Sequence, residues 1–129
     1  MAYSPEILLK RLTNFANSCR RLILKLPRTE YNITYGKQLI RSSSSPGANY
    51  IEAIEASSSK DFAHRLKICR KETKESKYWL ELIQESNNLT PFVKENTAIL
   101  IIEADELIKI FAASIITSER NQKIEKMSG

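Results

Sequence analysis

Hydrophobic and small residues recur at alternating spacings of four and three in several segments of this 129-residue chain. The first segment repeats at Leu8, Leu12, Phe15, Cys19, Leu22 and Leu26, and the third at Phe62, Leu66, Cys69, Thr73, Ser76, Leu80 and Ile83. The fourth repeats at Thr97, Ile101, Ala104, Ile108, Phe111 and Ile115, with a second row at Leu100, Leu107 and Ser114. A mean repeat of 3.5 residues keeps these side chains on one face of an α-helix, so the pattern predicts helices packed lengthwise against one another.

The second segment fits the same spacing although it contains four serines, a proline and a glycine. Its repeat positions are Ile33, Lys37, Ile40, Ser44, Gly47, Ile51 and Ile54. On this register Ser44 and Gly47 would face a neighbouring helix and allow the two backbones to approach closely. Pro46 removes one backbone hydrogen bond and should bend the helix, whereas a complete break that starts a new helix at Ser45 and Pro46 is the alternative.

Capping residues divide the chain into four helices. Ser4 before Pro5 and Thr90 before Pro91 are typical helix starts, and Ser58 with Asp61 resembles a capping box. We therefore predict helices at about 5–26, 30–57, 59–86 and 91–120, with 121–129 as a frayed tail. This arrangement is one all-α domain over residues 1–129, an antiparallel up-down-up-down, left-handed four-helix bundle with the second helix kinked near Pro46.

The composition is that of an ordinary globular protein, with 42% hydrophobic and 27% charged residues. The most apolar run, 98–102, ends at Glu103 and is far shorter than the ~20 residues that cross a bilayer. We expect no signal peptide, no membrane span and a cytoplasmic location. Cys19 and Cys69 fall on core positions and are predicted to be buried, reduced thiols.

The sequence gives little support to catalysis, metal binding or a cofactor. His64 is the only histidine, so neither a His-paired triad nor a two-histidine metal site can form within one chain. Carboxylates three residues apart, at Glu52 and Glu55 and at Glu72 and Glu75, lack the Glu-x-x-His motif of di-iron bundles. We expect instead a structural role for three polar residues, in which Asn49 and Glu52 hydrogen-bond across helices or pair with Arg41.

The excess of positive charge lies in the first and third helical segments. The net charge is +5, and residues 1–29 hold six Lys or Arg and one Glu. On the third segment the cations Lys60, Lys67, Arg70, Lys71, Lys74 and Lys77 lie on one flank, and Asp61, Glu72 and Glu75 lie on the other. The residues predicted to contact nucleic acid are Arg20, Arg21, Lys25, Lys67, Arg70, Lys71 and Lys74.

Three residues near the end of the third segment, Tyr78, Trp79 and Leu82, fall outside its repeat. An exposed Trp beside Tyr and Leu often marks a contact surface, so these residues predict a subunit interface. Opposite charges on the two flanks favour a head-to-tail contact, which closes into a ring. A solvated face with incidental aromatic residues is the alternative.

The stretches "LPRTEY" and "RSSSSPGANYIEAIEASSSKDFAHRLKICRKETKESKYWLELI", followed by "EADELIKIFAASI", resemble the bacterial four helix bundle proteins, also called 23S rRNA intervening-sequence proteins. The resemblance covers about residues 15–117 and implies a small homo-oligomeric bundle, often a ring of five. A related branch consists of basic accessory proteins of retroelements, which associate with a reverse transcriptase. Where the family usually has a glycine after Glu52, this chain continues as Ala53-Ile54-Glu55, which affects the expected end of the second helix.

These observations predict a non-catalytic homo-oligomeric scaffold that binds RNA or a ribonucleoprotein partner through a basic face. The alternative is a protein-only interaction module, for example an accessory protein of a reverse transcriptase, whose mild basicity is incidental. An enzyme is the third and weakest reading. Contact with RNA would be directed at the backbone, because the chain shows no aromatic stacking motif of the usual RNA-binding modules.

Overall fold

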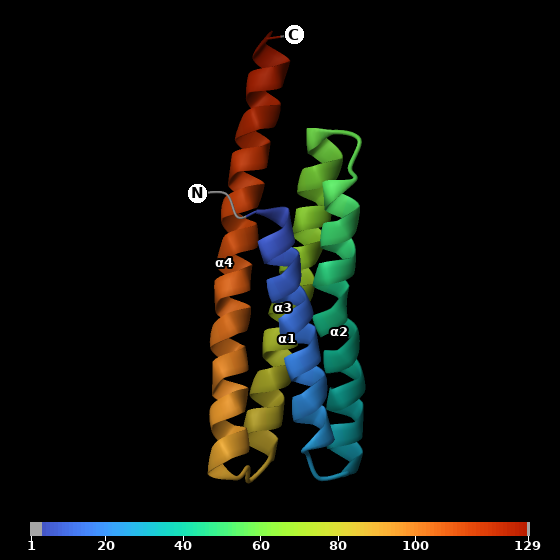
Figure 1. Ribbon diagram of the computed structural model, residues 1–129, viewed down its shortest axis with the longest axis vertical. Helices are drawn as coiled ribbons and strands as arrows, with labels where there is room; N and C mark the ends of the chain where they lie inside the picture. The colour runs from blue at the N-terminus through green and yellow to red at the C-terminus, as the bar shows by residue number, and fades with distance from the viewer. Residues whose placement is uncertain (1–3, 129) are drawn as a thin grey trace.

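The computed structural model describes residues 4–128 and contains four helices, α1 (Pro5–Leu24), α2 (Glu30–Ile54), α3 (Ser59–Ser86) and α4 (Pro91–Ser128). Successive helices run in opposite directions along a common axis and form a four-helix bundle (Figure 1). The predicted helix starts are correct, because Ser4, Thr29 and Ser58 each accept a hydrogen bond from the backbone N–H three residues later. None of the described helices is long and apolar enough to span a membrane.

The last helix differs most from the expected boundaries. α4 continues to Ser128, beyond the helix end predicted near residue 120, and its C-terminal end projects past the rest of the bundle (Figure 1). The start of α3 holds part of this extension: Gln122 Nε2 donates a hydrogen bond to the Ser59 carbonyl at 3.3 Å, and Ser59 Oγ donates to Glu125 at 2.9 Å.

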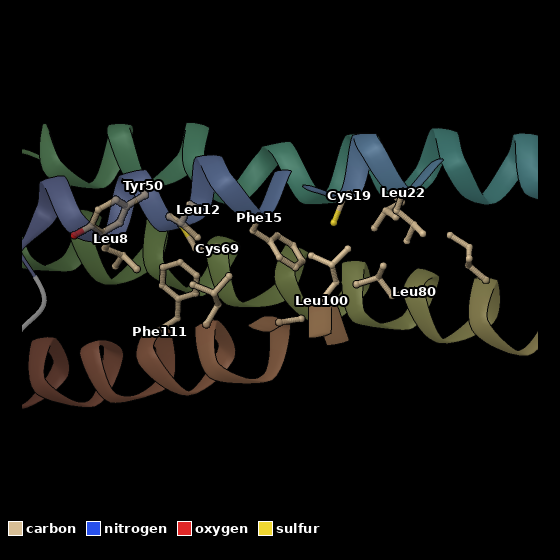
Figure 2. Packing of buried hydrophobic residues seen from close by; sticks show 14 of the residues in the cluster. Leu8, Leu12, Phe15, Cys19, Leu22, Tyr50, Cys69, Leu80, Leu100 and Phe111 are labelled. Atoms are coloured by element: carbon tan, nitrogen blue, oxygen red, sulfur yellow. The ribbon is translucent and has the colours of Figure 1, made fainter. Parts of the chain in front are cut away.

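Each helix packs against two neighbours, in the order α1, α2, α3, α4 and back to α1. The backbones of α1 and α4 are less closely packed than those of any other neighbouring pair, and α1 and α3 are diagonally opposite. Buried side chains of all four helices fill the interior between them (Figure 2). The predicted core positions of α1 are all buried, and those of α3 from Leu66 to Ile83 are too.

The predicted register of α2 is wrong by one residue. Its buried positions are Asn32, Gly36, Leu39, Ser42, Ser43, Pro46, Tyr50 and Ala53, whereas the predicted apolar positions Ile33, Ile40, Ile51 and Ile54 are exposed. The helix passes through Pro46 without interruption, so the alternative of a break is wrong, and a bend there stays a prediction.

Small residues on the inner face of α2 explain this register. Ser76 Oγ of α3 donates a hydrogen bond to Ser42 Oγ at 2.9 Å, and the Cys69 thiol lies 3.3 Å from the Pro46 carbonyl. Such contacts require the backbones of α2 and α3 to lie close together, and isoleucine side chains would hold them apart. Both cysteines are buried as free thiols, as the sequence predicted.

Candidate nucleic-acid and subunit interfaces

The cations predicted on α3 lie along its outer side. Lys67 Nζ pairs with Glu119 at 3.1 Å and Lys77 Nζ pairs with Asp105 at 2.8 Å, so two of them bridge to α4. Lys60, Lys71 and Lys74 are exposed, and none of them forms an ion pair with another described residue. Arg70 is half-buried beside them. We call Lys60, Lys67, Arg70, Lys71 and Lys74 the α3 basic stripe.

The cations predicted on α1 do not join this stripe. Arg20, Arg21 and Lys25 are exposed, but α1 is diagonally opposite α3 in the bundle, so the two groups face different directions. Two of the three also have local partners, because Arg21 donates a hydrogen bond to Ser18 at 3.2 Å and Lys25 Nζ lies 4.9 Å from the Phe92 ring centroid. The prediction of a single basic face formed by both groups is therefore wrong.

The acidic flank of α3 is turned toward α2. Arg41 Nη1 donates a hydrogen bond to Glu72 Oε1 at 2.7 Å, and Arg41 Nη2 pairs with Glu75. Glu72 is buried, so the guanidinium neutralises a carboxylate that has little access to water. Both carboxylates are therefore paired with Arg41 of the same protomer, so they are not free to pair with a cation of the next protomer in the predicted head-to-tail contact.

Of the three polar residues that the sequence grouped together, Asn49 makes the expected cross-helix hydrogen bond, and Arg41 and Glu52 behave differently. Asn49 Oδ1 accepts a hydrogen bond from Arg65 at 3.2 Å, and its amide group donates to Ser45 on its own helix. Arg41 binds Glu72 and Glu75 instead of Asn49 or Glu52. Glu52 is exposed and has no hydrogen-bond or ion-pair partner among the described residues, so its predicted cross-helix role is wrong.

Trp79 is held within its own protomer. Its ring lies between Tyr35 and Tyr78, with centroid distances of 6.0 and 5.4 Å, and its Nε1 donates a hydrogen bond to Glu75 at 3.3 Å. The side chain is half-buried against the core. The expectation that Trp79 is an exposed residue is therefore wrong. Tyr78 stays exposed and Leu82 is half-buried, and a subunit contact at these residues stays a prediction.

His64 lines one surface pocket together with Glu52, Glu55 and Asp61. His64 is exposed, and no group of three or more His, Cys, Asp or Glu side chains among residues 4–128 is placed to hold a metal ion. Burial raises the pKa of both the Cys19 and Cys69 thiols to about 12, so each stays protonated and unreactive at neutral pH. Hydrogen bonds from Ser57 and Ser58 lower the pKa of the exposed Asp61.

Two surface features were missed by the sequence interpretation. The first is the row of exposed isoleucines Ile33, Ile40, Ile51 and Ile54 on α2, which we call the α2 stripe. The second is a cavity of about 190 Å³ between α1 and α4, with Leu22, Val93 and Leu100 at its floor and Arg21, Lys25 and Asn96 at its walls. The spacing of the isoleucine row predicts a core position, whereas the structure exposes it to solvent.

Residues 7–113 match the family model of the 23S rRNA-intervening sequence proteins. Among solved structures, the chain is similar to a protein with unknown function from the S23 ribosomal protein family of Bacteroides thetaiotaomicron. That similarity has 30% identity and a TM-score of 0.75, and it covers 86% of this chain and 96% of the other. A comparison with curated proteins finds no significant match.

Proposed function

The chain belongs to the 23S rRNA-intervening sequence protein family, and we propose that it is a non-catalytic, cytoplasmic, homo-oligomeric scaffold that binds RNA or a ribonucleoprotein through the α3 basic stripe. The observation that carries the proposal is the outward row of cations on α3, three of which have no ion-pair partner among the described residues. From Lys60 to Lys74 the row extends about 21 Å along the helix, enough to contact several phosphates.

The chemistry of this face fits a phosphate backbone better than base edges. Its cations are long, flexible and presented by the side of a helix, and the ion pair of Lys67 with Glu119 is exposed and therefore weak. A phosphate can displace such a carboxylate at small cost. The sequence pI of about 9.3 gives the whole molecule the same bias.

The experiment compares two charge-reversal variants. Lys71→Glu with Lys74→Glu removes the centre of the α3 basic stripe, and Arg20→Glu with Lys10→Glu makes the same charge change on exposed positions of α1. Binding to ribosomal RNA is measured at about 50 and 200 mM salt. We expect wild-type affinity to fall by at least tenfold with salt, since each phosphate contact releases counterions. The α3 variant should lose most of the low-salt binding, and the α1 variant should keep most of it.

A second candidate is a protein-only interaction module, such as an accessory protein of a reverse transcriptase. The α2 stripe favours it, because regularly spaced, exposed isoleucines are more suited to a protein partner than to RNA. RNA binding that is absent at low salt, or that the two variants weaken equally, would reject the α3 basic stripe and favour this candidate.

A further inference from the structure

The cavity between α1 and α4 is a groove with an apolar floor. It lies along the pair of neighbouring helices whose backbones are least closely packed (Figure 1). The buried side chains of Leu22, Val93 and Leu100 form the floor, and the exposed Ile99 extends the apolar surface at the rim. Leu22 and Leu100 belong to the main core cluster, so the floor is part of the packed interior (Figure 2). We call this surface the α1–α4 groove, and its lining residues are Ser18, Arg21, Leu22, Lys25, Val93, Asn96, Ile99 and Leu100.

The cations on the wall of the α1–α4 groove have no acidic partner across the seam between the two helices. Further along the same seam, Arg11 of α1 pairs with Glu103 of α4 through two nitrogens, each at 2.7 Å. Arg21 and Lys25, also on α1, are exposed and form no ion pair with any described residue. No carboxylate of the described residues lines the groove, and Glu95, the acid of α4 nearest to it in sequence, lies outside the lining. The wall therefore presents two positive charges above an apolar floor.

The size of the α1–α4 groove limits what can fill it. Its volume of about 190 Å³ is somewhat larger than a cavity of roughly 150 Å³ that holds benzene, and smaller than the roughly 300–1,000 Å³ of pockets that enclose a drug-sized ligand. The groove therefore suits one large apolar side chain better than a complete small molecule. Arg21 and Lys25 are four residues apart on one helix, about 6 Å along its axis, so each can pair with a carboxylate close to that side chain.

We infer that the α1–α4 groove binds an acidic segment of a partner protein, which places one large apolar side chain on the floor and carboxylates against Arg21 and Lys25. Charge complementarity selects this occupant. A basic or neutral segment would leave both cations without partners, and the phosphates of a nucleic acid would leave the apolar floor unused. The inference goes beyond the proposed function, because α1 is diagonally opposite α3 and the two ligands would occupy different faces.

Synthetic peptides test the two requirements placed on the partner. The probe is a short, fluorescein-labelled helical peptide with a central Phe and a Glu one turn before and one turn after it. A second peptide has Ala in place of Phe, and a third has Gln in place of each Glu. We expect fluorescence anisotropy at low salt to show binding of the first peptide and at least roughly tenfold weaker binding of the other two, because each lacks one half of the match. Equal binding of the Phe and Ala peptides would overturn the inference, since charge alone would then attract the ligand.

Variants of the full chain test the site. Arg21→Glu with Lys25→Glu should weaken binding of the Phe peptide at least roughly tenfold. Lys123→Glu with Lys126→Glu makes the same charge change at exposed positions of α4 outside the groove and should keep the affinity within about twofold. Asn96→Trp leaves both cations in place but fills the groove, so it should also weaken binding. Circular dichroism checks that all three variants stay helical.

The outcomes separate this inference from the proposed function. Wild-type protein that does not bind the Phe peptide at low salt, or charge-reversal variants that weaken binding equally, would overturn the acidic partner. Either result leaves the α3 basic stripe intact, because that stripe is tested separately with Lys71→Glu and Lys74→Glu. Displacement of the bound peptide by a single-stranded RNA oligonucleotide would show that the groove is a phosphate site and would overturn the inference as well.

Discussion

Arg41 on α2 and Glu72 on α3 form an ion pair, with Nη1 2.7 Å from Oε1, in which the carboxylate is buried and the guanidinium is about half exposed. The same guanidinium also pairs with Glu75. One side chain therefore ties α2 to two successive turns of α3, at the boundary between core and solvent.

The first prediction follows from this unequal burial. Arg41→Met should lower the free energy of unfolding by about 1 to 2 kcal/mol, because it leaves the buried Glu72 carboxylate without its partner; the exposure of Arg41 limits the effect. Arg41→Met combined with Glu72→Gln should recover part of the loss. Urea denaturation of the single and double variants measures this, and additive losses would contradict the pairing.

The second prediction concerns Trp79. Trp79→Ala should lower the free energy of unfolding by about 2 to 3 kcal/mol, somewhat less than for a fully buried aromatic residue, since the ring is half-buried between Tyr35 and Tyr78. Trp79→Phe should cost less because only the hydrogen bond to Glu75 and part of the ring are lost. If Trp79→Ala keeps its stability but dissociates in sedimentation, the residue belongs to a subunit contact after all.

The third prediction compares two glycines of α2. Gly47→Ala should stabilise the protein by about 0.5 to 1 kcal/mol, because the added Cβ makes only ordinary contacts and helix propensity improves. Gly36→Ala should lack this gain, since its Cβ would lie 3.0 Å from Ile23 Cγ2. In an Ile23→Ala background the gain at Gly36 should appear. Thermal unfolding of the four variants measures it, and equal gains at both glycines would show that the Ile23 contact relaxes freely.

The fourth prediction concerns the pH dependence of stability. Burial raises the pKa of Cys19 and Cys69 from 9.0 to about 12, so between these values the unfolded chain releases thiol protons that the folded chain retains. Stability is unaffected by the thiols below pH 9 and falls above it, by up to roughly 1.4 kcal/mol per pH unit for each thiol. Urea denaturation from pH 8 to 11 measures this fall. A Cys19→Ala, Cys69→Ala variant that declines as steeply as wild type would contradict it.

The helix starts, the core row of α1 and the core row of α3 from Leu66 to Ile83 were determined by the sequence alone. On α4 the core combines parts of both predicted rows, because Thr97, Leu100, Ala104, Leu107, Phe111 and Ile115 are buried whereas Ile101 and Ile108 are half-buried. Ser4, Thr29 and Ser58 cap the helices through hydrogen bonds made within the first turn, which depend only on neighbouring residues. On α1 the residues Leu8, Leu12, Phe15, Cys19 and Leu22 form one continuous heptad row, whereas the other large apolar residues of the helix cluster at its two ends. In such segments the capping residues and the hydrophobic periodicity are enough to predict where the helix begins and which face is buried.

Only the tertiary structure decided which face of α2 is buried. Two rows one residue apart share the same spacing, and the row with more isoleucine is the exposed one. The inner row is selected because Gly36 faces Ile23 of α1 and Ser42 bonds Ser76 of α3, and these close approaches exclude large side chains. The diagonal placement of α1 and α3 likewise separated two basic clusters that look alike in sequence. Both outcomes depend on which helices become neighbours, and periodicity within a single helix does not contain that information.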